Sequence, residues 1–330
     1  MYKHIMSLLY ILIVMVPSNA LGDQVELPNG DVYEGDFVDG LRDGRGVYEW
    51  ADGNRYEGQF VEDRLQGEGT YTWRDGRTYT GTFLRDRREG QGLMRWPNGD
   101  RYEGEFRNNQ MHGTGTFTWE NQDRYTGQFN NSLRTGRGVF TWQSGEQYSG
   151  DFVAGALHGE GTYRFRDGRQ FTGTYSEGEK NGEGVFQWPN GNRYVGDFRD
   201  DQRHGRGIFY WRDGTVYRGQ FEINKMNGWG VKRQPDGVQE IQHWQDGVLT
   251  LSTPIVRQAR CELSYLERKW MFDSPTCINA LAHGSGVAAS LDGQYILLDA
   301  RFVLGQLVEG RLLELPVDTE AGFSVPESQS

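Results

Sequence analysis

The chain has 330 residues, with 46 acidic and 35 basic side chains and a formal net charge of −11. This balance argues against nucleic-acid binding and does not favour attachment to anionic membranes, because both surfaces repel an acidic chain. Glycine contributes 47 residues and aromatic side chains 13% of the sequence, and both enrichments follow from an internal repeat.

Residues 1–20 have the pattern of a secretory signal peptide. Lys3 lies near the start, residues 5–16 are almost entirely apolar, and Ser18-Asn19-Ala20 is a small-x-small cleavage site. The apolar stretch is too short to span a bilayer comfortably, which disfavours the alternative of an uncleaved anchor without excluding it. We expect a mature chain that begins near Leu21 and a periplasmic or secreted location.

A pattern of 23 residues repeats along residues 21–250. In one copy it reads Tyr56-Glu-Gly58-Gln-Phe60, then Gly67-Glu-Gly69-Thr-Tyr71-Thr-Trp73, then Asp75-Gly76. A fixed period of this size is typical of repeat architectures. The same pattern begins at Tyr33, Tyr56, Tyr79, Tyr102, Tyr125, Tyr148, Phe171, Tyr194 and Tyr217.

Alternation within each copy predicts two short strands. Aromatic residues at every second position place their rings on one face of a sheet and the intervening polar residues on the other. Glycine inside a strand normally weakens it, so we expect Gly58 to leave room for the ring of a neighbouring repeat.

Both turns of the repeat can be read from the sequence. The third position after each Phe or Tyr slot, such as Asp63 or Gly155, is nearly always Gly, Asp or Asn, which tolerate a left-handed backbone. The second turn carries Asp-Gly or Asn-Gly, a strong hairpin signal. The fourth copy has Glu120-Asn121-Gln122 instead, so either Asn121 takes the left-handed position there or that turn is strained. The predicted fold is all-β: an elongated, twisted, single-layer antiparallel sheet of stacked hairpins, with a small β-rich C-terminal cap.

This pattern resembles the MORN repeat (membrane occupation and recognition nexus). The resemblance rests on Y-x-G-x-F, G-x-G-x-Y/F-x-W and D/N-G at constant spacing, over about residues 25 to 247. It implies a curled single-layer β-sheet that serves as a scaffold, an oligomerisation device or a membrane-proximal tether. It does not identify a ligand.

The pattern changes after Thr250. We expect a small cap over residues 251–313 that contains a diverged repeat, and a disordered tail over residues 314–330. Within the cap, residues 255–272 fit either strand or helical spacing, and the alternation around Arg260 to Tyr265 favours strand. Cys261 and Cys277 are the only cysteines, and an even pair in an exported chain predicts a disulfide. Two free thiols are the alternative.

No set of residues indicates catalysis, a metal or a cofactor. The carboxylates fall mostly on turns or on the polar face, and no pair stands out as a catalytic acid and base. His112, His158 and His204 recur every 46 residues. Two repeats of separation place neighbouring members of this set ~19 Å apart, too far to share one zinc ion. We therefore expect a non-enzymatic protein without a cofactor or metal.

The aromatic face is the candidate binding surface. Its rings can serve packing alone, which is the interpretation we favour from the sequence, or they can form a trough for an extended ligand, because Tyr and Trp combine apolar surface with a polar group. The candidate binding residues are Tyr102, Phe106, Trp119, Tyr125, Phe129, Trp142 and Tyr148.

These two interpretations predict different outcomes for Trp142→Phe. If the rings only pack, the change lowers stability slightly and leaves binding intact. If they form a binding trough, it weakens binding at an unchanged melting temperature.

The sequence predicts a scaffold or protein-interaction module in an exported compartment. The main alternative is binding of carbohydrate or cell wall through the aromatic rings, and a lipid-surface tether comes third because the charge does not favour it. We expect a protein partner and no nucleic acid, and a homo-oligomer remains open.

Overall fold

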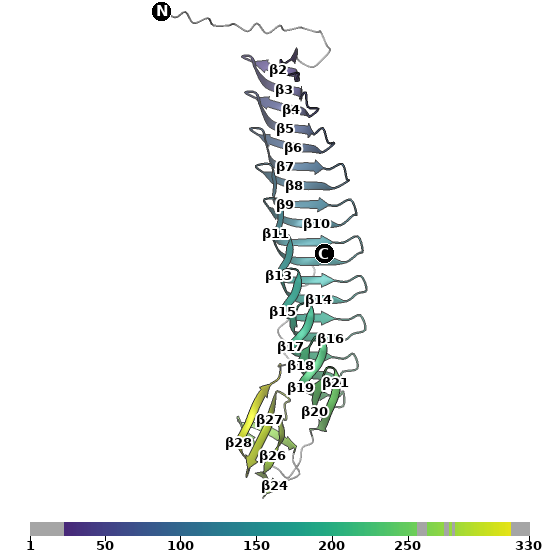
Figure 1. Cartoon of the computed structure of the whole chain (residues 1–330), viewed down its shortest axis with the longest axis vertical. Coiled ribbons are helices and arrows are strands. Elements are labelled where there is room, and N and C mark those ends of the chain that lie inside the picture. The colour runs from purple at the N-terminus through teal and green to yellow at the C-terminus, as the bar shows by residue number, and fades with distance from the viewer. Residues whose placement is uncertain (1–22, 256–262, 274–276, 279–280, 318–330) are drawn as a thin grey trace, which may run out of the picture. The chain divides into compact units, whose positions relative to one another are not determined.

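The computed structural model describes residues 23–255, 263–273, 277–278 and 281–317 (Figure 1). This part of the chain forms strands and turns and contains no helix. It divides into two compact units, residues 1–156 and residues 157–330, whose boundary falls inside strand β13. The predicted signal peptide, residues 1–20, lies outside the described residues.

Unit 1 consists of hairpins in chain order. Each strand pairs antiparallel with the next one along the chain, and after β1 strands of seven and nine residues alternate. Its strands are β1 (Asp23–Glu26), β2 (Val32–Val38), β3 (Leu41–Glu49), β4 (Arg55–Val61), β5 (Arg64–Thr72), β6 (Thr78–Leu84), β7 (Arg87–Arg95), β8 (Arg101–Arg107), β9 (Gln110–Thr118), β10 (Arg124–Asn130), β11 (Leu133–Thr141) and β12 (Gln147–Val153).

Unit 2 continues the hairpins and adds the C-terminal cap. The hairpin strands are β13 (Ala156–Arg164), β14 (Gln170–Ser176), β15 (Glu179–Gln187), β16 (Arg193–Arg199), β17 (Gln202–Tyr210), β18 (Val216–Glu222), β19 (Lys225–Arg233), β20 (Gln239–Gln245) and β21 (Val248–Pro254). The cap strands are β22 (Ser264–Tyr265), β23 (Arg268–Asp273), β24 (Cys277–Ile278), β25 (Leu281–Ala282), β26 (Gly284–Ser290), β27 (Tyr295–Val303) and β28 (Gln306–Glu314). Strands β1 to β21 belong to one antiparallel sheet of 21 strands, which confirms the predicted all-β repeat fold.

The first turn of each repeat adopts the predicted left-handed backbone. Glu62 and Asp63 have φ of 46° and 67°. Positive φ at both central residues is the pattern of a type I′ turn, whose twist matches that of the flanking strands. The confirmed slot residues are Gly40, Asp63, Asp86, Asn109, Ser132, Gly155, Gly178, Asp201 and Asn224, all at positive φ.

The second turn confirms the glycine positions and decides between the alternatives for the fourth repeat. Gly53 has a φ of 91°, and its N–H donates to the Trp50 backbone oxygen at 2.9 Å. In the fourth repeat Gln122, and not Asn121, takes this position with a φ of 71°. Of the two alternatives for this turn, the structure shows the strained one, because the hydrogen bond from the Gln122 N–H to the Trp119 backbone oxygen fixes the left-handed position whatever residue fills it.

The strand glycines make room for a ring of their own repeat. The Tyr56 hydroxyl donates to the Gln59 backbone oxygen at 3.0 Å, so the ring lies along its own hairpin. A Cβ at Gly58 or Gly69 would lie 2.4 Å or 2.3 Å from the Tyr56 hydroxyl oxygen. The expectation that Gly58 accommodates a neighbouring repeat was therefore wrong, since the phenol folds back to bond within its own strand.

Hydrogen bonds at both ends of the strands join consecutive repeats. At one end the Leu65 N–H donates to Asp86 Oδ1 at 2.8 Å, and at the other end the Arg74 N–H donates to Asn54 Oδ1 at 3.0 Å. Leu65 lies at the start of β5 and Arg74 in the turn that follows it, so these bonds give backbone amides near both ends of the strand a partner in a neighbouring repeat. The polar turn residues therefore set the stacking of the hairpins as well as their local backbone.

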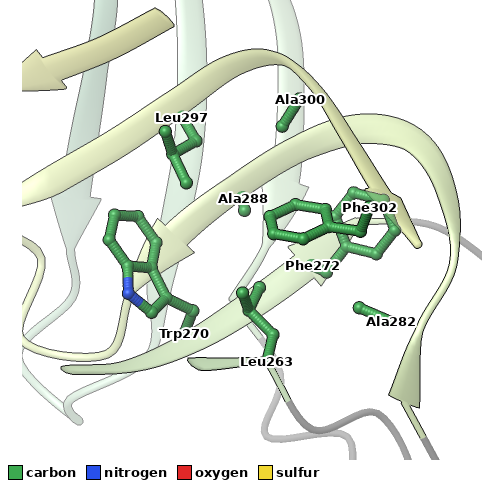
Figure 2. Close-up of a cluster of buried hydrophobic side chains, with 8 residues drawn as sticks. All are labelled: Leu263, Trp270, Phe272, Ala282, Ala288, Leu297, Ala300 and Phe302. Carbon is green, nitrogen blue, oxygen red and sulfur yellow. The ribbon is translucent and has the colours of Figure 1, made fainter. Parts of the chain in front are cut away.

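The cap has a hydrophobic core of its own. Strands β22, β23, β26, β27 and β28 form a five-stranded sheet, and Trp270, Phe272, Leu297 and Phe302 pack together on it (Figure 2). Within residues 255–272, the described residues 263–272 carry strands β22 and β23, as favoured over helix, while residues 256–262 lie outside the described residues.

A second cluster joins the cap to the last hairpins of unit 2. Ile296 and Leu298, which alternate with Leu297 along β27, pack against Val231 and Ile241 of the hairpin strands. Leu315 belongs to the same cluster with only 1% of its surface exposed. The tail predicted to begin at residue 314 is thus ordered through residue 317, because Leu315 inserts into this core.

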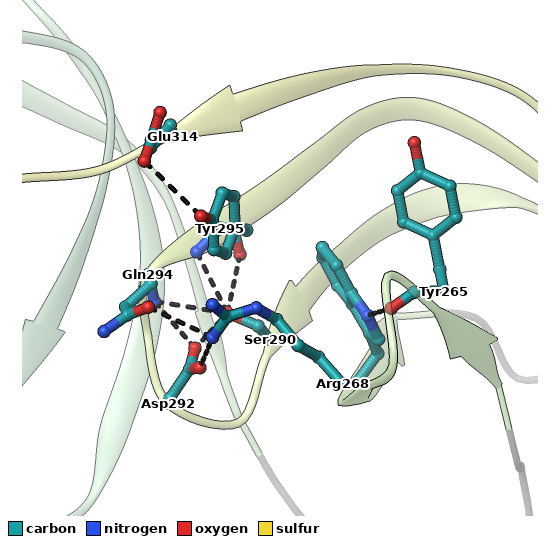
Figure 3. A network of polar contacts seen from close by, with 8 residues as sticks. Tyr265, Arg268, Ser290, Asp292, Gln294, Tyr295 and Glu314 are labelled. Atoms are coloured by element: carbon teal, nitrogen blue, oxygen red, sulfur yellow. Dashed lines mark hydrogen bonds and ion pairs between the residues drawn. The ribbon is translucent and has the colours of Figure 1, made fainter.

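A polar network holds the turn between β26 and β27 (Figure 3). The Ser290 hydroxyl donates to Asp292 Oδ1 at 2.5 Å and accepts the Tyr295 N–H at 2.9 Å. Arg268 pairs with Asp292 and lies 4.7 Å from the centre of the Tyr295 ring. These contacts link β23 to the turn, which assigns the network a structural role.

Candidate functional site

The rings of the first strand in each repeat form a buried row. Tyr102, Tyr125 and Tyr148 are fully buried, and Phe106 and Phe129 are each 4% exposed. Tyr102 contacts the Phe106 ring of its own repeat at 5.2 Å and the Phe129 ring of the next at 5.0 Å, both edge to face. These five candidate residues thus build the core of the sheet and offer almost no surface to a ligand.

The rings of the second strand form a second row, in which Phe140 is buried and Phe117 and the tryptophans are half-buried. Phe117 and Trp119 lie 4.6 Å apart, Trp119 and Phe140 5.2 Å, and Phe140 and Trp142 4.5 Å. Trp119 and Trp142 are half-buried. Of the seven candidate residues, these two are the ones that a ligand can reach.

The structure adds a row of cations that sequence reasoning missed. Their side chains lie on the aromatic face: Arg134, for example, lies 5.7 Å from the Trp119 ring centre and 5.1 Å from that of Phe140. The row consists of Arg42, Arg88, Arg134, Lys180 and Arg203. In the sequence, this row corresponds to the second residue of each longer strand. At that position a cation mostly alternates with Leu or Met.

Each arginine of this row also fastens the next hairpin turn. Arg88 Nη2 donates to the Asn109 backbone oxygen at 2.7 Å, and Arg134 Nη2 donates to that of Gly155 at 2.7 Å. Burial lowers the pKa of the Arg88 and Arg134 guanidinium groups below the ordinary value. These two guanidinium groups lie in a partly apolar setting, where a pairing anion is worth more than in water.

A groove opens on this face at the fourth, fifth and sixth repeats. It has a volume of about 530 Å³, and its lining includes Met111, Phe117, Trp119, Phe129, Arg134 and Gly155. The walls are mainly apolar and aromatic, with one guanidinium among them. This combination can take an extended chain that offers apolar groups and an anion.

The opposite face of unit 1 has a different chemistry. Thr70 and Thr80 face each other across β5 and β6, and their hydroxyl oxygens lie 3.0 Å apart. Thr116 and Thr126 repeat this pairing at 3.0 Å. The two faces of the hairpins are thus distinct, one polar and one aromatic.

The structure bears only in part on the sequence expectations about metal binding, the membrane and the disulfide. Among the described residues, no group of three or more His, Cys, Asp or Glu side chains could hold a metal ion. In the same part of the chain, no helix has the length and apolarity to cross a membrane. Cys261 and the Cys277 side chain lie outside what is described, so their disulfide stays a prediction.

Similar solved structures share low sequence identity with this chain. The TCP10 domain of CPAP from Danio rerio is 16% identical, covering 70% of this chain and 98% of that one, with a TM-score of 0.29. The TCP domain of SAS-4 (dCPAP) from Drosophila melanogaster, solved in complex with a proline-rich motif of Ana2, is 17% identical, covering 54% and 85%, with a TM-score of 0.25. Such scores support no functional argument. The search of curated proteins found no match.

A family model, in contrast, matches most of the hairpin region. The MORN repeat model matches residues 33–55, 56–76, 79–101, 102–124, 125–147, 148–168, 171–193, 194–216 and 217–239. These nine matches cover more than half of the chain and coincide with the hairpins described above. MORN repeats serve in general as scaffolds or as modules that interact with proteins or membranes. The chain belongs to the MORN-repeat family.

Proposed function

We propose that this protein is a non-enzymatic interaction module whose aromatic face binds a protein partner in an exported compartment. The observation that carries the proposal is the groove of about 530 Å³ at the fourth to sixth repeats. It joins accessible rings to a cation on a face whose tyrosines are buried. Apolar and aromatic surface with few, well-placed polar groups is typical of protein-binding sites.

Two further features support parts of this proposal. Asp63 and Asp86 accept strand N–H groups of the preceding repeat at 3.0 Å and 2.8 Å, so these carboxylates have structural roles, in keeping with a protein that does no chemistry. The signal-like pattern of residues 1–20 supports export.

Carbohydrate binding is the second candidate. The half-exposed Trp119 and Trp142 favour it, because aromatic rings provide flat surfaces on which sugars stack. A soluble cell-wall oligosaccharide that shifts tryptophan fluorescence, with the shift lost in Trp142→Leu, would favour this candidate over a protein partner.

Site-specific photo-crosslinking tests the proposed function. The photoreactive p-benzoylphenylalanine replaces Phe117 in the groove or, as a control, the exposed Glu103 on the opposite face. Illumination of the full chain in its native compartment should yield a discrete protein adduct from position 117 and none from position 103. Equal adducts from both positions, or none from position 117, would contradict the proposal.

A further inference from the structure

Arg134 differs from the other four cations in the residue that faces it from the next hairpin turn. Asp or Asn occupies that position in the four other cases, and its side-chain oxygen accepts the backbone N–H of the cationic residue at 2.9–3.1 Å; the pairs are Arg42–Asp63, Arg88–Asn109, Lys180–Asp201 and Arg203–Asn224. Opposite Arg134 stands Gly155, which has no side chain. The groove opens where that side chain is missing.

The Arg134 guanidinium has unused donors, and no side chain faces it from the next hairpin turn. Its Nη2 atom bonds the Gly155 backbone oxygen at 2.7 Å, and the structure gives it no ion pair among the described residues. Four rings surround it, with centres 5.1–5.7 Å from the guanidinium carbon. A guanidinium carries five N–H donors in a fork that suits a carboxylate, and a partly buried cation without an anion is costly to leave unpaired.

The residues that line the groove next to Arg134 favour a ligand with an apolar side chain beside its anionic group. The half-buried Met111 presents apolar surface on one side, and the half-buried Phe117 and Trp119 add accessible rings. Such a floor takes an apolar side chain, and methionine adapts to irregular shapes. A ligand that offered only an acidic group would leave this apolar surface exposed to water.

We propose that the groove binds an extended polypeptide segment in which an Asp or Glu side chain pairs with Arg134 and a neighbouring apolar side chain packs on Met111 and Trp119. The proposal rests on the proposed function and adds the chemistry of the partner. The ligand carboxylate replaces the Asp that faces Arg42 or Lys180 in other repeats. Gly155 is thus a specificity-determining residue, since its missing side chain keeps the site open.

Two substitutions close the site while respecting the fold. Gly155→Asp introduces an internal carboxylate at a position where Asp63 and Asp201 already adopt φ of 67° and 66°. Arg134→Leu removes the cation from a slot that Leu65 fills in the second repeat. The matched control is Gly178→Asp, the same change one repeat later, where the facing residue is Leu157 and not a cation.

The probes are short, terminally blocked, fluorescein-labelled peptides that carry one Glu beside one Phe, together with twins in which Gln replaces Glu. Fluorescence anisotropy with the full chain should show the Glu peptides binding about tenfold more tightly than their twins, as a charge-assisted hydrogen bond supplies. The difference should persist in Gly178→Asp and vanish in Gly155→Asp and Arg134→Leu. Circular dichroism melts of all variants show whether each one is folded.

The inference is overturned if the Glu and Gln peptides bind the unmodified protein equally or not at all. It is also overturned if the preference for Glu survives in folded Gly155→Asp. Its failure is distinguishable from failure of the proposed function. A protein cross-linked from position 117 without any preference for Glu would leave the interaction role standing and remove only the carboxylate.

Discussion

A Cβ atom added at Gly69 would lie 2.3 Å from the hydroxyl oxygen of Tyr56. The pair shows why each repeat carries glycine at two facing strand positions: the fully buried tyrosine ring lies over them. This arrangement lets a single layer of strands bury aromatic side chains without a second layer on top. Glycine is therefore part of the core packing of this sheet.

Gly69→Ala tests this packing. The added methyl group meets the ring and the hydroxyl of Tyr56, and overpacking a filled site costs about 1–3 kcal/mol. We expect the free energy of unfolding of the affected repeats to fall by that amount, measured by urea denaturation. The control Glu57→Ala, on the exposed opposite face, should stay within about 0.5 kcal/mol of the unmodified protein. Equal effects of the two changes would contradict the account.

Gln122 holds a left-handed backbone where eight other repeats place glycine. Its φ of 71° strains an L-residue, while Gly145 takes the same position in the next repeat with a φ of 91°. Gln122→Gly should raise stability by about 1 kcal/mol, because glycine adopts this conformation without the penalty. The reverse change Gly145→Gln should lower it by a similar amount. Thermal melts of both variants check the sign, and a loss of stability in Gln122→Gly would refute the assignment of strain.

The buried tyrosines predict steep alkaline unfolding. Burial raises the pKa of Tyr33 and Tyr125 to about 12, and burial with the Asp31 hydrogen bond does the same for Tyr48. An unfolded tyrosine titrates near pH 10. Above that pH the unfolded chain loses protons that the folded chain keeps, so stability is complete below about pH 10 and falls as the pH rises towards 12.

Absorbance at the phenolate band, followed together with circular dichroism, measures this linkage. The phenolate signal should appear in one step with loss of the fold, while a urea-unfolded control titrates gradually near pH 10. A gradual titration near pH 10 with the fold intact would show that the tyrosines are not buried as described.

Export and the cap disulfide remain testable predictions from the sequence. Secreted protein should have an intact mass that begins near Leu21, and Cys261 and Cys277 should be joined. The disulfide closes a short loop and contributes roughly 3 kcal/mol in the chain-entropy model. Thiol titration of the unfolded, unreduced chain should find no reactive thiol, and two per chain would refute the bridge.

The repeat could be predicted from the sequence because its period, turns and alternation act locally. Asp63 and Gly53 each mark a turn by backbone preference alone, and both turns form as expected. The ring that lies over Gly58 could not be predicted from the sequence, since the direction of the Tyr56 ring depends on a hydrogen bond to its own strand. Leu315 looked like part of a polar tail because its contacts lie far away along the chain.

The candidate site could be predicted only in part. Aromatic spacing located the face but not which rings are accessible, because exposure depends on how Tyr125 and Trp119 pack on the next repeat. The sequence does not mark Arg134 as part of the candidate site, because an arginine on a hairpin strand resembles a solvated surface charge. Gly155 lies 21 residues after Arg134 in the sequence. Their relationship becomes visible only when the alternation of cations with Leu or Met along the longer strands is compared with the residues at the next hairpin turns.

The central claim is that the half-exposed tryptophans contact a partner while the buried tyrosines hold the sheet. The most direct test is Trp119→Phe in the groove, with the affinity for the protein captured from position 117 and the melting temperature measured on the same preparation. The account predicts a several-fold loss of affinity with a melting temperature nearly unchanged, because Trp119 is half-buried and phenylalanine keeps the contact with Phe140. A lowered melting temperature with unchanged affinity would contradict it and would mean that the rings serve packing alone.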